Sequence, residues 1–175
     1  MPAHTIFSVM PTIRVDDLND VVVQIDGRIL LSKNVHEYPK YDYDEQFIKH
    51  KNCANVTYRG EGEIDGQGWM WWLKFAFNKD SNYRPRLIEV HEMDGFEWSG
   101  IKLKNSPNSH LQILDSRNAY LHDFEIRVDP WKHILGYKIP MFGFNTDGID
   151  AGVDNLLIER VNITSHDDAV VIKKG

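Results

Sequence analysis

Apolar residues return at the same four offsets, 0, 2, 5 and 7, in three segments of the chain. Offsets of two are typical of a half-buried strand. The extra residues in the middle of each copy are polar or glycine and indicate a corner between two short strands. The three copies are Phe96, Trp98, Ile101 and Leu103; Ala119, Leu121, Phe124 and Ile126; and Leu156, Ile158, Val161 and Ile163.

The spacing of these copies favours an all-β solenoid. The first two copies begin 23 residues apart, and the third begins 37 residues later, after an insert that contains Trp131 and Gly136. Short strands, polar corners, a period in the low twenties and no convincing amphipathic helix are typical of stacked coils. An antiparallel sandwich with similar strands is the alternative that the pattern leaves open.

The N-terminal third fits the same scheme. Residues 21–27 and 55–60 each predict a strand that runs into a turn. Between them, residues 37–51 are charged and aromatic, and we expect a surface excursion there. No composition shift marks a boundary, so we expect one β-helix domain over residues 1–175.

Composition excludes some classes of function. The 26 acidic residues outnumber the 20 basic ones, and the formal charge of −6 argues against nucleic acid as a partner. An acidic polysaccharide stays possible, because local lysines can hold its carboxylates. Cys53 is the only cysteine, so no internal disulfide can form. No apolar run predicts a membrane span, and the start of the chain lacks the features of a signal peptide.

Acidic residues gather near the end of the sequence. Asp147 lies 20 residues before Asp167 and 21 before Asp168, with one strand-like segment between them. A spacing of about one coil can bring the three carboxylates to one surface. Clustered carboxylates repel one another, which tends to raise one pKa and leave a proton donor beside a base. This equipment suits hydrolysis of a glycosidic bond.

Several segments, in the right order, resemble the polygalacturonases of glycoside hydrolase family 28. The glycine-rich run from Gly60 precedes two tryptophans, and the two acidic motifs stand at the end. The matching segments are residues 23–27, 60–68 with Trp71 and Trp72, 84–88, 105–107 with His110, 145–148, and Asp167 and Asp168 followed by Ile172, Lys173 and Gly175.

The resemblance implies a right-handed parallel β-helix that hydrolyses pectic polysaccharide with inversion, without a cofactor or a metal. It implies that Asp167 is the general acid, and that Asp147 and Asp168 position and activate the attacking water. An inverting site separates its acid from its base by roughly 6.5–9.5 Å, and carboxylates on adjacent coils can provide that distance. As isolated residues, these aspartates would be turn residues.

Three further residues are candidates for substrate binding. Asn145 could contact sugar or shape the loop around Asp147. His110 could reach the substrate or could be a buried partner of its neighbours. Lys173, next to Lys174, could hold a uronate carboxylate or be a solvated lysine. Asp150 is expected to be a turn residue.

The tryptophans have two possible roles. Trp69, Trp71 and Trp72 could stack on sugar rings, and Trp131 could line a subsite for one. The alternative is that tryptophans beside a glycine-rich turn are buried caps over the core.

The sequence also departs from the family pattern. His166 stands where the family usually has a glycine before the paired aspartates, and Ala169 stands where a cysteine often follows. The family's Gly-His-Gly and Arg-Ile-Lys motifs do not occur in these 175 residues. We therefore expect a chain truncated at both ends. A non-catalytic carbohydrate-binding or structural solenoid, or a sister hydrolase acting on rhamnogalacturonan, is the alternative function.

Two expectations concern the protein's surroundings. Pectin lies outside cells, so the full-length protein is expected to be secreted. A solenoid cut at Gly175 would expose a strand edge, so the isolated chain is expected to associate with itself through that edge.

Overall fold

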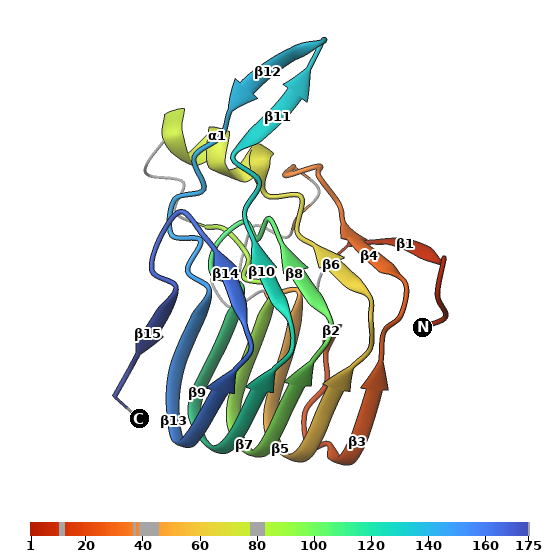
Figure 1. Ribbon diagram of the computed structural model, residues 1–175, viewed down its shortest axis with the longest axis vertical. Helices are drawn as coiled ribbons and strands as arrows, with labels where there is room; N and C mark the ends of the chain where they lie inside the picture. The colour runs from red at the N-terminus through yellow and green to blue at the C-terminus, as the bar shows by residue number, and fades with distance from the viewer. Residues whose placement is uncertain (11–12, 37, 39–45, 78–82, 175) are drawn as a thin grey trace.

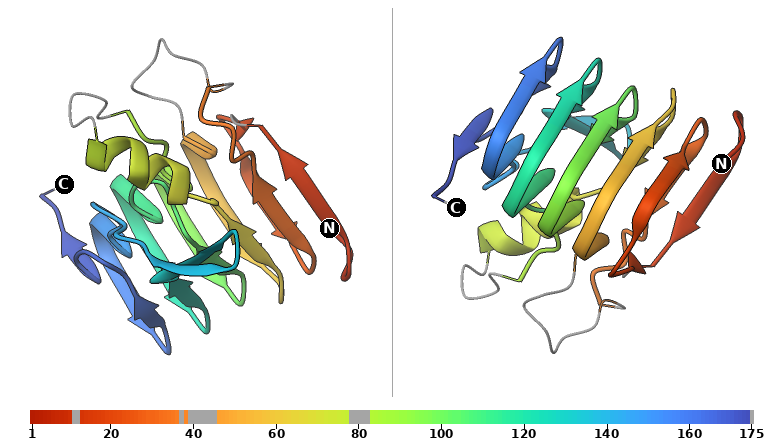
Figure 2. Two further views of the ribbon diagram at one scale, coloured as in Figure 1. Left: turned by 90° about the horizontal axis from the view of Figure 1, so that it is seen from above. Right: turned by 90° about the horizontal axis from the view of Figure 1, so that it is seen from below.

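Two parallel sheets form the body of the protein, and their strands stack in the order of the coils (Figures 1 and 2). The computed structural model describes residues 1–10, 13–36, 38, 46–77 and 83–174. The short-strand sheet contains, in spatial order, β1 (Ile6–Val9), β4 (Arg28–Leu31), β6 (Glu63–Asp65), β8 (Lys102–Lys104), β10 (Glu125–Arg127) and β14 (Asn162–Thr164).

The long-strand sheet packs against the first. In spatial order it contains β15 (Val170–Ile172), β13 (Ile149–Glu159), β9 (Leu111–His122), β7 (Ile88–Ser99), β5 (Ile48–Arg59) and β2 (Ile13–Arg14), with β3 (Asn19–Gln24) also paired to β5. Successive coils add a strand to each sheet, as β7 and β8 or β9 and β10 do. The chain is therefore a right-handed parallel β-helix, as predicted from the resemblance.

The register of the strands confirms the predicted repeat. Phe96 lies beside Ala119, and Ala119 lies beside Leu156 on the next coil. In the short-strand sheet, Ile126 lies between Leu103 and Ile163. Equivalent positions of the repeat thus form ladders that point into one core. Burial of these ladders between the two sheets supplies the main stabilisation of the fold.

The polar corners between the two sheets adopt a left-handed backbone conformation. Gly100 has a φ of 72°, and the corresponding corner residues Asp123 and Arg160 have φ values of 56° and 53°. A Cβ on Gly100 would lie 2.2 Å from the carbonyl oxygen of Gly60, so only glycine fits there. On the next two coils, the guanidinium of Arg160 binds the Asp123 carboxylate at 2.6 and 2.8 Å. This pair offsets part of the conformational cost of two non-glycine corners.

The predicted strands of the N-terminal third are present as β3 and β5. The expectation of a surface excursion over residues 37–51 is wrong for its last part, because Ile48 begins β5 and Lys49 and His50 are buried. Residues 37 and 39–45 of that stretch lie outside the described residues.

The structure contains a short helix, α1 (Trp69–Phe77), where the sequence showed no convincing amphipathic helix. It begins where the Trp72 N–H donates to the carbonyl of Gly68 at 3.0 Å. Trp71 packs with Val35 and Tyr38, whereas Trp72 packs with another apolar cluster on the opposite side. Apolar residues on two sides obscure the helical period in the sequence. Among the described residues, no helix is both long and apolar enough to cross a membrane.

The insert after the second copy of the repeat forms an antiparallel hairpin, β11 (Trp131–Ile134) and β12 (Tyr137–Pro140). Leu135 and Gly136 make its two-residue turn, with φ values of 48° and 83°. Figure 1 shows the hairpin and α1 together at the top of the view, above the strands of the two sheets.

Candidate active site

Three aspartates converge where two adjacent strands of the long-strand sheet begin. Asp147 lies in the loop before β13, and Asp167 and Asp168 lie before β15. One carboxylate oxygen from each lies within 4.8 Å of the other two. We call Asp147, Asp167 and Asp168 the acidic cluster. The structure thus brings together the three residues that the sequence singled out.

Backbone hydrogen bonds between the coils hold the two loops in register. The Gly148 N–H donates to the Asp168 carbonyl at 2.9 Å. The Asp167 carboxylate accepts one hydrogen bond from the Asn145 N–H at 3.2 Å and another from the Asp168 N–H at 2.9 Å. Both oxygens of Asp167 are therefore anchored to the loops that carry the other two aspartates, which fixes the orientation of this carboxylate.

Asp147 is partly buried, whereas Asp167 and Asp168 are exposed. Burial raises the pKa of Asp147, and the nearby charges of Asp150, Asp167 and Asp168 raise it further. A carboxyl group in this setting keeps its proton to a higher pH than a solvated aspartate does. The acidic cluster therefore contains one carboxyl group, that of Asp147, whose surroundings favour its protonated form.

His110 lies beneath the acidic cluster and has no exposed surface. Its ring Nδ1 lies 3.0 Å from the Asp147 carbonyl oxygen, and its Nε2 accepts from the Ser106 N–H at 3.2 Å. Burial lowers the pKa of His110 to about 4, so the ring is neutral at physiological pH, and its Nδ1–H donates to Asp147. The structure favours the alternative of a buried partner for this residue, because a ring without exposed surface cannot contact a sugar.

Arg84 is a functional candidate that the sequence reasoning did not single out. It is buried, and its guanidinium donates to the Asn145 Oδ1 at 2.7 Å, to the Pro107 carbonyl at 3.2 Å, and to the Phe144 carbonyl. Burial lowers the pKa of Arg84 to about 10, while the charge of Asp147 opposes that shift. Arg84 is therefore a charged clamp under the loop that carries Asp147. The only indication of this role in the sequence was that Arg84 begins residues 84–88, one of the segments that resemble the family.

Asn145 is exposed and has a φ of 52°. Because Arg84 holds its Oδ1, the amide group is fixed and its Nδ2 remains available as a donor. The contact with Arg84 agrees with the role of shaping the loop, and contact with a sugar stays a prediction.

Lys173 lies beside Asp150 rather than in the acidic cluster. Its Nζ is 3.0 Å from the Asp150 Oδ2, which also accepts from the Gln112 Nε2 at 3.2 Å. Asp150 itself is a buried residue of β13, so the expectation of a turn residue is wrong. The side chain of Lys173 is 37% exposed, so its ammonium group can reach solvent on one side.

His166, which replaces the usual glycine, is built into the loop. Its Nδ1 accepts from the Gly143 N–H at 3.0 Å, and its backbone N–H donates to the Thr146 Oγ1 at 3.3 Å. The Thr146 hydroxyl in turn donates to the Gly143 carbonyl at 2.7 Å. The substitution thus adds a link between the two loops of the acidic cluster.

The spacing of the acidic cluster could also hold one cation, because carboxylate oxygens are the ligands that Ca²⁺ and Mg²⁺ prefer. Exposed acidic groups also take this arrangement without an ion. Among the described residues, no other group of three potential ligands is as close together.

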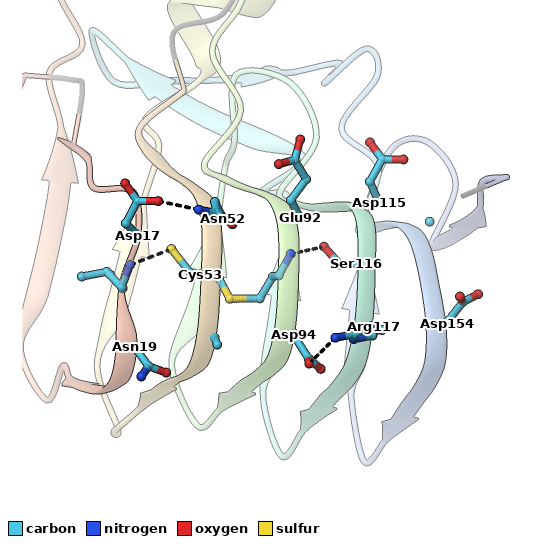
Figure 3. Close-up of a pocket in the computed structure, with 14 residues that line it drawn as sticks. Asp17, Asn19, Asn52, Cys53, Glu92, Asp94, Asp115, Ser116, Arg117 and Asp154 are labelled. Atoms are coloured by element: carbon cyan, nitrogen blue, oxygen red, sulfur yellow. Dashed lines mark hydrogen bonds and ion pairs between the residues drawn. The ribbon is translucent and has the colours of Figure 1, made fainter.

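A groove of about 860 Å³ crosses the middle of the long-strand sheet, away from the acidic cluster (Figure 3). Among its lining residues are Asp17, Asn52, Glu92, Asp94, Asp115 and Asp154. We call it the bend groove, because Asn52, Glu92 and Asp115 have positive φ values where their strands bend. Its polar side chains are largely paired: Asn52 donates to Asp17 at 2.6 Å, and Arg117 binds Asp94 at 2.8 Å. Because these contacts join side chains on neighbouring strands, we interpret the bend groove as a structural part of the sheet.

Comparison with known proteins identifies the family. The family model described as glycosyl hydrolases family 28 matches residues 10–175. The chain is 34% identical over 126 residues to a probable polygalacturonase of Vitis vinifera, which covers 71% of this chain and 23% of the relative. It is 32% identical over 141 residues to an endo-polygalacturonase of Pectobacterium carotovorum subsp. carotovorum, which covers 74% of this chain and 32% of the relative.

A solved structure supports the fold. The endo-xylogalacturonan hydrolase of Aspergillus tubingensis superposes with a TM-score of 0.83 at 23% identity, covering 97% of this chain and 44% of that one. The chain therefore spans less than half of the length of these relatives: 23%, 32% and 44%. The family match over nearly the whole sequence, together with this fold, shows that the chain belongs to glycosyl hydrolases family 28.

Proposed function

We propose that the protein containing this chain hydrolyses α-1,4-galacturonosyl bonds of pectin. The observation that carries the proposal is the convergence of Asp147, Asp167 and Asp168 from two successive coils. Membership of family 28 and the two polygalacturonases among its relatives support this choice of substrate. The substrate places the full-length protein outside cells.

In the proposed reaction, Asp167 gives its proton to the oxygen that bridges two sugars, and the bond from that oxygen to C1 breaks. A water molecule attacks C1 from the opposite face, and its proton passes to the carboxylate of Asp147 or Asp168. Burial and the charges of Asp150, Asp167 and Asp168 raise the pKa of Asp147, so a proton received from the attacking water is held there more firmly than on a solvated aspartate.

The stereochemistry needs its own test. The nearest oxygens of the three carboxylates lie within 4.8 Å, which is shorter than the separation of roughly 6.5–9.5 Å between the carboxyl groups of a typical inverting site. We keep inversion as the proposal. Proton NMR of the first product should show the β-anomer at the new reducing end, whereas an initial α-anomer would contradict it.

Substrate binding is assigned to the exposed polar groups around the acidic cluster. The Nδ2 of Asn145 would donate to a sugar hydroxyl, and the half-exposed ammonium of Lys173 would face a uronate carboxylate. His110 would act from below, by holding the carbonyl of Asp147.

The experiment that tests the function is reducing-sugar release from polygalacturonic acid by the full-length protein and its Asp167→Asn variant. General acid–base catalysis contributes typically about 10²- to 10⁴-fold, so the variant should lose at least about 100-fold. Asp154→Asn, which changes a carboxylate of the bend groove, is the matched control and should retain the parent activity. Equal activity in the parent and in Asp167→Asn would reject the assignment. Rhamnogalacturonan and neutral galactan, tested alongside, would separate a sister activity.

A further inference from the structure

The side chain of His166 completes a ring of hydrogen bonds between the two loops that carry the acidic cluster. The Gly143 N–H donates to the His166 Nδ1 at 3.0 Å, and the His166 N–H donates to the Thr146 Oγ1 at 3.3 Å. The Thr146 hydroxyl closes the ring by donating to the Gly143 carbonyl at 2.7 Å. We call Gly143, Thr146 and His166 the loop ring. Each member donates once and accepts once, so loss of the imidazole would leave the Gly143 N–H without its acceptor.

The half of the loop ring that belongs to the loop before β13 is held in place by packing. Thr146 has no exposed surface. A Cβ on Gly143 would lie 2.8 Å from the Thr146 Cγ2 and 3.2 Å from the Trp72 ring in α1, so a side chain there would have to displace at least one of them. Gly143 and Thr146 therefore have little room to move, and His166 is fixed against a rigid surface.

The loop ring adjoins the contacts that orient Asp167, the proposed general acid. His166 immediately precedes Asp167, and Thr146 immediately follows Asn145. The Asn145 N–H donates to the Asp167 carboxylate at 3.2 Å, and the Ser165 hydroxyl donates to the Asp167 carbonyl at 2.7 Å. The bond that orients the acid thus lies one residue from the loop ring on each loop. A shift of His166 would therefore move the Asp167 carboxylate relative to Asn145.

The loop ring requires a neutral imidazole at His166. A neutral imidazole has one nitrogen that accepts a hydrogen bond, whereas the imidazolium cation carries a hydrogen on both nitrogens. In the cation, the Nδ1–H and the Gly143 N–H would face each other as two donors.

Other charged or titratable side chains surround the loop ring. The two loops carry Asp147, Asp167 and Asp168, α1 carries Lys74, Arg84 and His110 lie beneath the loop of Asp147, and the ion pair of Asp150 and Lys173 follows in the next strands. None of these side chains belongs to the loop ring. Among the titratable groups named here, only the imidazole of His166 therefore removes an acceptor from the ring when it takes up a proton.

We propose that His166 is a positioning residue for Asp167 and that it acts only while its imidazole is neutral. The neutral imidazole ties the loop of the general acid to the loop of Asp147. When the imidazole takes up a proton, the loop ring opens and the Asp167 carboxylate loses its fixed orientation, so hydrolysis slows. Imidazoles in general titrate at higher pH than carboxylates, so this loss would set the acid limit of activity. The inference rests on the proposed function for the role of Asp167, whereas the loop ring does not depend on that function.

The kinetic test measures kcat and KM of the full-length protein on polygalacturonic acid over roughly pH 4 to 8, a range that brackets imidazole titration. His166→Gly introduces the residue that is usual in the family. It should lower kcat at pH 7 about tenfold and change KM by less than about twofold, because a bond that orients a reacting group is lost. His166→Asn keeps an acceptor near the position of Nδ1 but cannot titrate. It should retain the parent kcat at pH 7 and stay active at acidic pH, where the parent has slowed.

His122→Asn is the matched control for these two variants. The His122 imidazole lies 3.2 Å from Glu97 and 2.7 Å from Asp123, at the end of β9 that is farther from the acidic cluster. This substitution should leave kcat and its pH profile unchanged. Equal kcat in the parent and in His166→Gly would overturn the proposal, and so would the same acid limb in the parent and in His166→Asn.

Amide hydrogen exchange reads the loop ring without turnover. The Gly143 N–H should be protected in the parent and in His166→Asn at pH 7, and in His166→Gly it should exchange about tenfold faster relative to its intrinsic rate. The Asn145 N–H, which reports the orientation of Asp167, should also exchange faster in His166→Gly. Acid should remove the protection of Gly143 in the parent but not that of the Gly148 N–H, which donates to the next coil. Unchanged protection of Gly143 in His166→Gly would contradict the proposal, whereas a parent inactive on polygalacturonic acid would reject only the proposed function.

Discussion

The acidic cluster and the bend groove are both rich in carboxylates on the long-strand sheet, yet their electrostatics differ. In the bend groove, Asp94 binds Arg117, and Glu92 lies 3.1 Å from Lys51. In the acidic cluster, three carboxylates face one another, and the pKa of Asp147 is raised. The difference teaches that the number of acidic residues does not mark a catalytic site. Carboxylates that face one another without a neighbouring cation to balance their charge are the better sign.

The largest expected effect is on activity. Asp147→Asn and Asp168→Asn should each reduce hydrolysis of polygalacturonate by roughly 100-fold or more, because they remove carboxylates that handle the attacking water. Asp115→Asn in the bend groove should change it by less than about twofold, which reducing-sugar assays can resolve. The comparison breaks if substitutions in the two regions have similar effects.

The next effect concerns the clamp beneath the acidic cluster. Arg84→Met should lower the free energy of unfolding by about 2 kcal/mol, because it leaves the buried Pro107 carbonyl and the partly buried acceptors of Phe144 and Asn145 without their donor. Because the loop that carries Asp147 loses its support, kcat should fall more than KM changes. Denaturant titration and steady-state kinetics provide both readouts. Arg117→Met, which removes an exposed arginine of the bend groove, is the control and should have little effect on either.

A further contrast lies in position, because the acidic cluster adjoins β15 at one edge of its sheet and the bend groove crosses the middle. Val170 and Ile172 of β15 are 41% and 73% exposed. We predict that the isolated 175-residue polypeptide associates through this edge, and that Val170→Lys reduces its apparent mass at high concentration. Light scattering measures this mass. Phe77→Lys, which charges an exposed apolar residue on α1, should not change it.

The smallest expected effect is on the pH dependence of stability. The folded-state pKa of Asp147 is raised, so its ionisation opposes folding once the pH rises above the unfolded value of 3.8, and this cost is absent at lower pH. Asp147→Asn should therefore raise the Tm relative to the parent at pH 7, with the difference vanishing near pH 3.

Asp94 provides the opposite sign. Hydrogen bonds from Arg117 and Asn118 lower its pKa, so its stabilisation is present above 3.8 and is lost as the pH falls through the lowered value. Asp94→Asn should lower the Tm at pH 7 and have less effect in acid. Thermal melts over pH 3–7 test both signs, and equal behaviour of the two variants would contradict the electrostatic comparison.

The sequence predicted the elements that repeat. Offsets of apolar residues place Phe96, Ala119 and Leu156 on one ladder, because each coil must match its neighbour. The spacing of Asp147 from Asp167 likewise reflects one coil. Both predictions rest on periodicity, which a single sequence displays directly.

What the sequence did not predict depends on contacts outside the repeat. The helix α1 carries apolar residues on two sides and shows no single face. The burial of His110 and the clamp by Arg84 result from loops that meet only after the coils have stacked. Lys173 pairs with Asp150 because adjacent strands align them, a detail of register that neither motif contains.

The hydrogen bonds from Gly148 and Asn145 to the following coil make catalysis depend on contact between two coils. Two of the three aspartates arrive on the segment before β15, so the acidic cluster exists only after that segment has docked. Undocking of this one segment would separate Asp147 from the other two aspartates, so activity depends on continued contact between these two neighbouring coils.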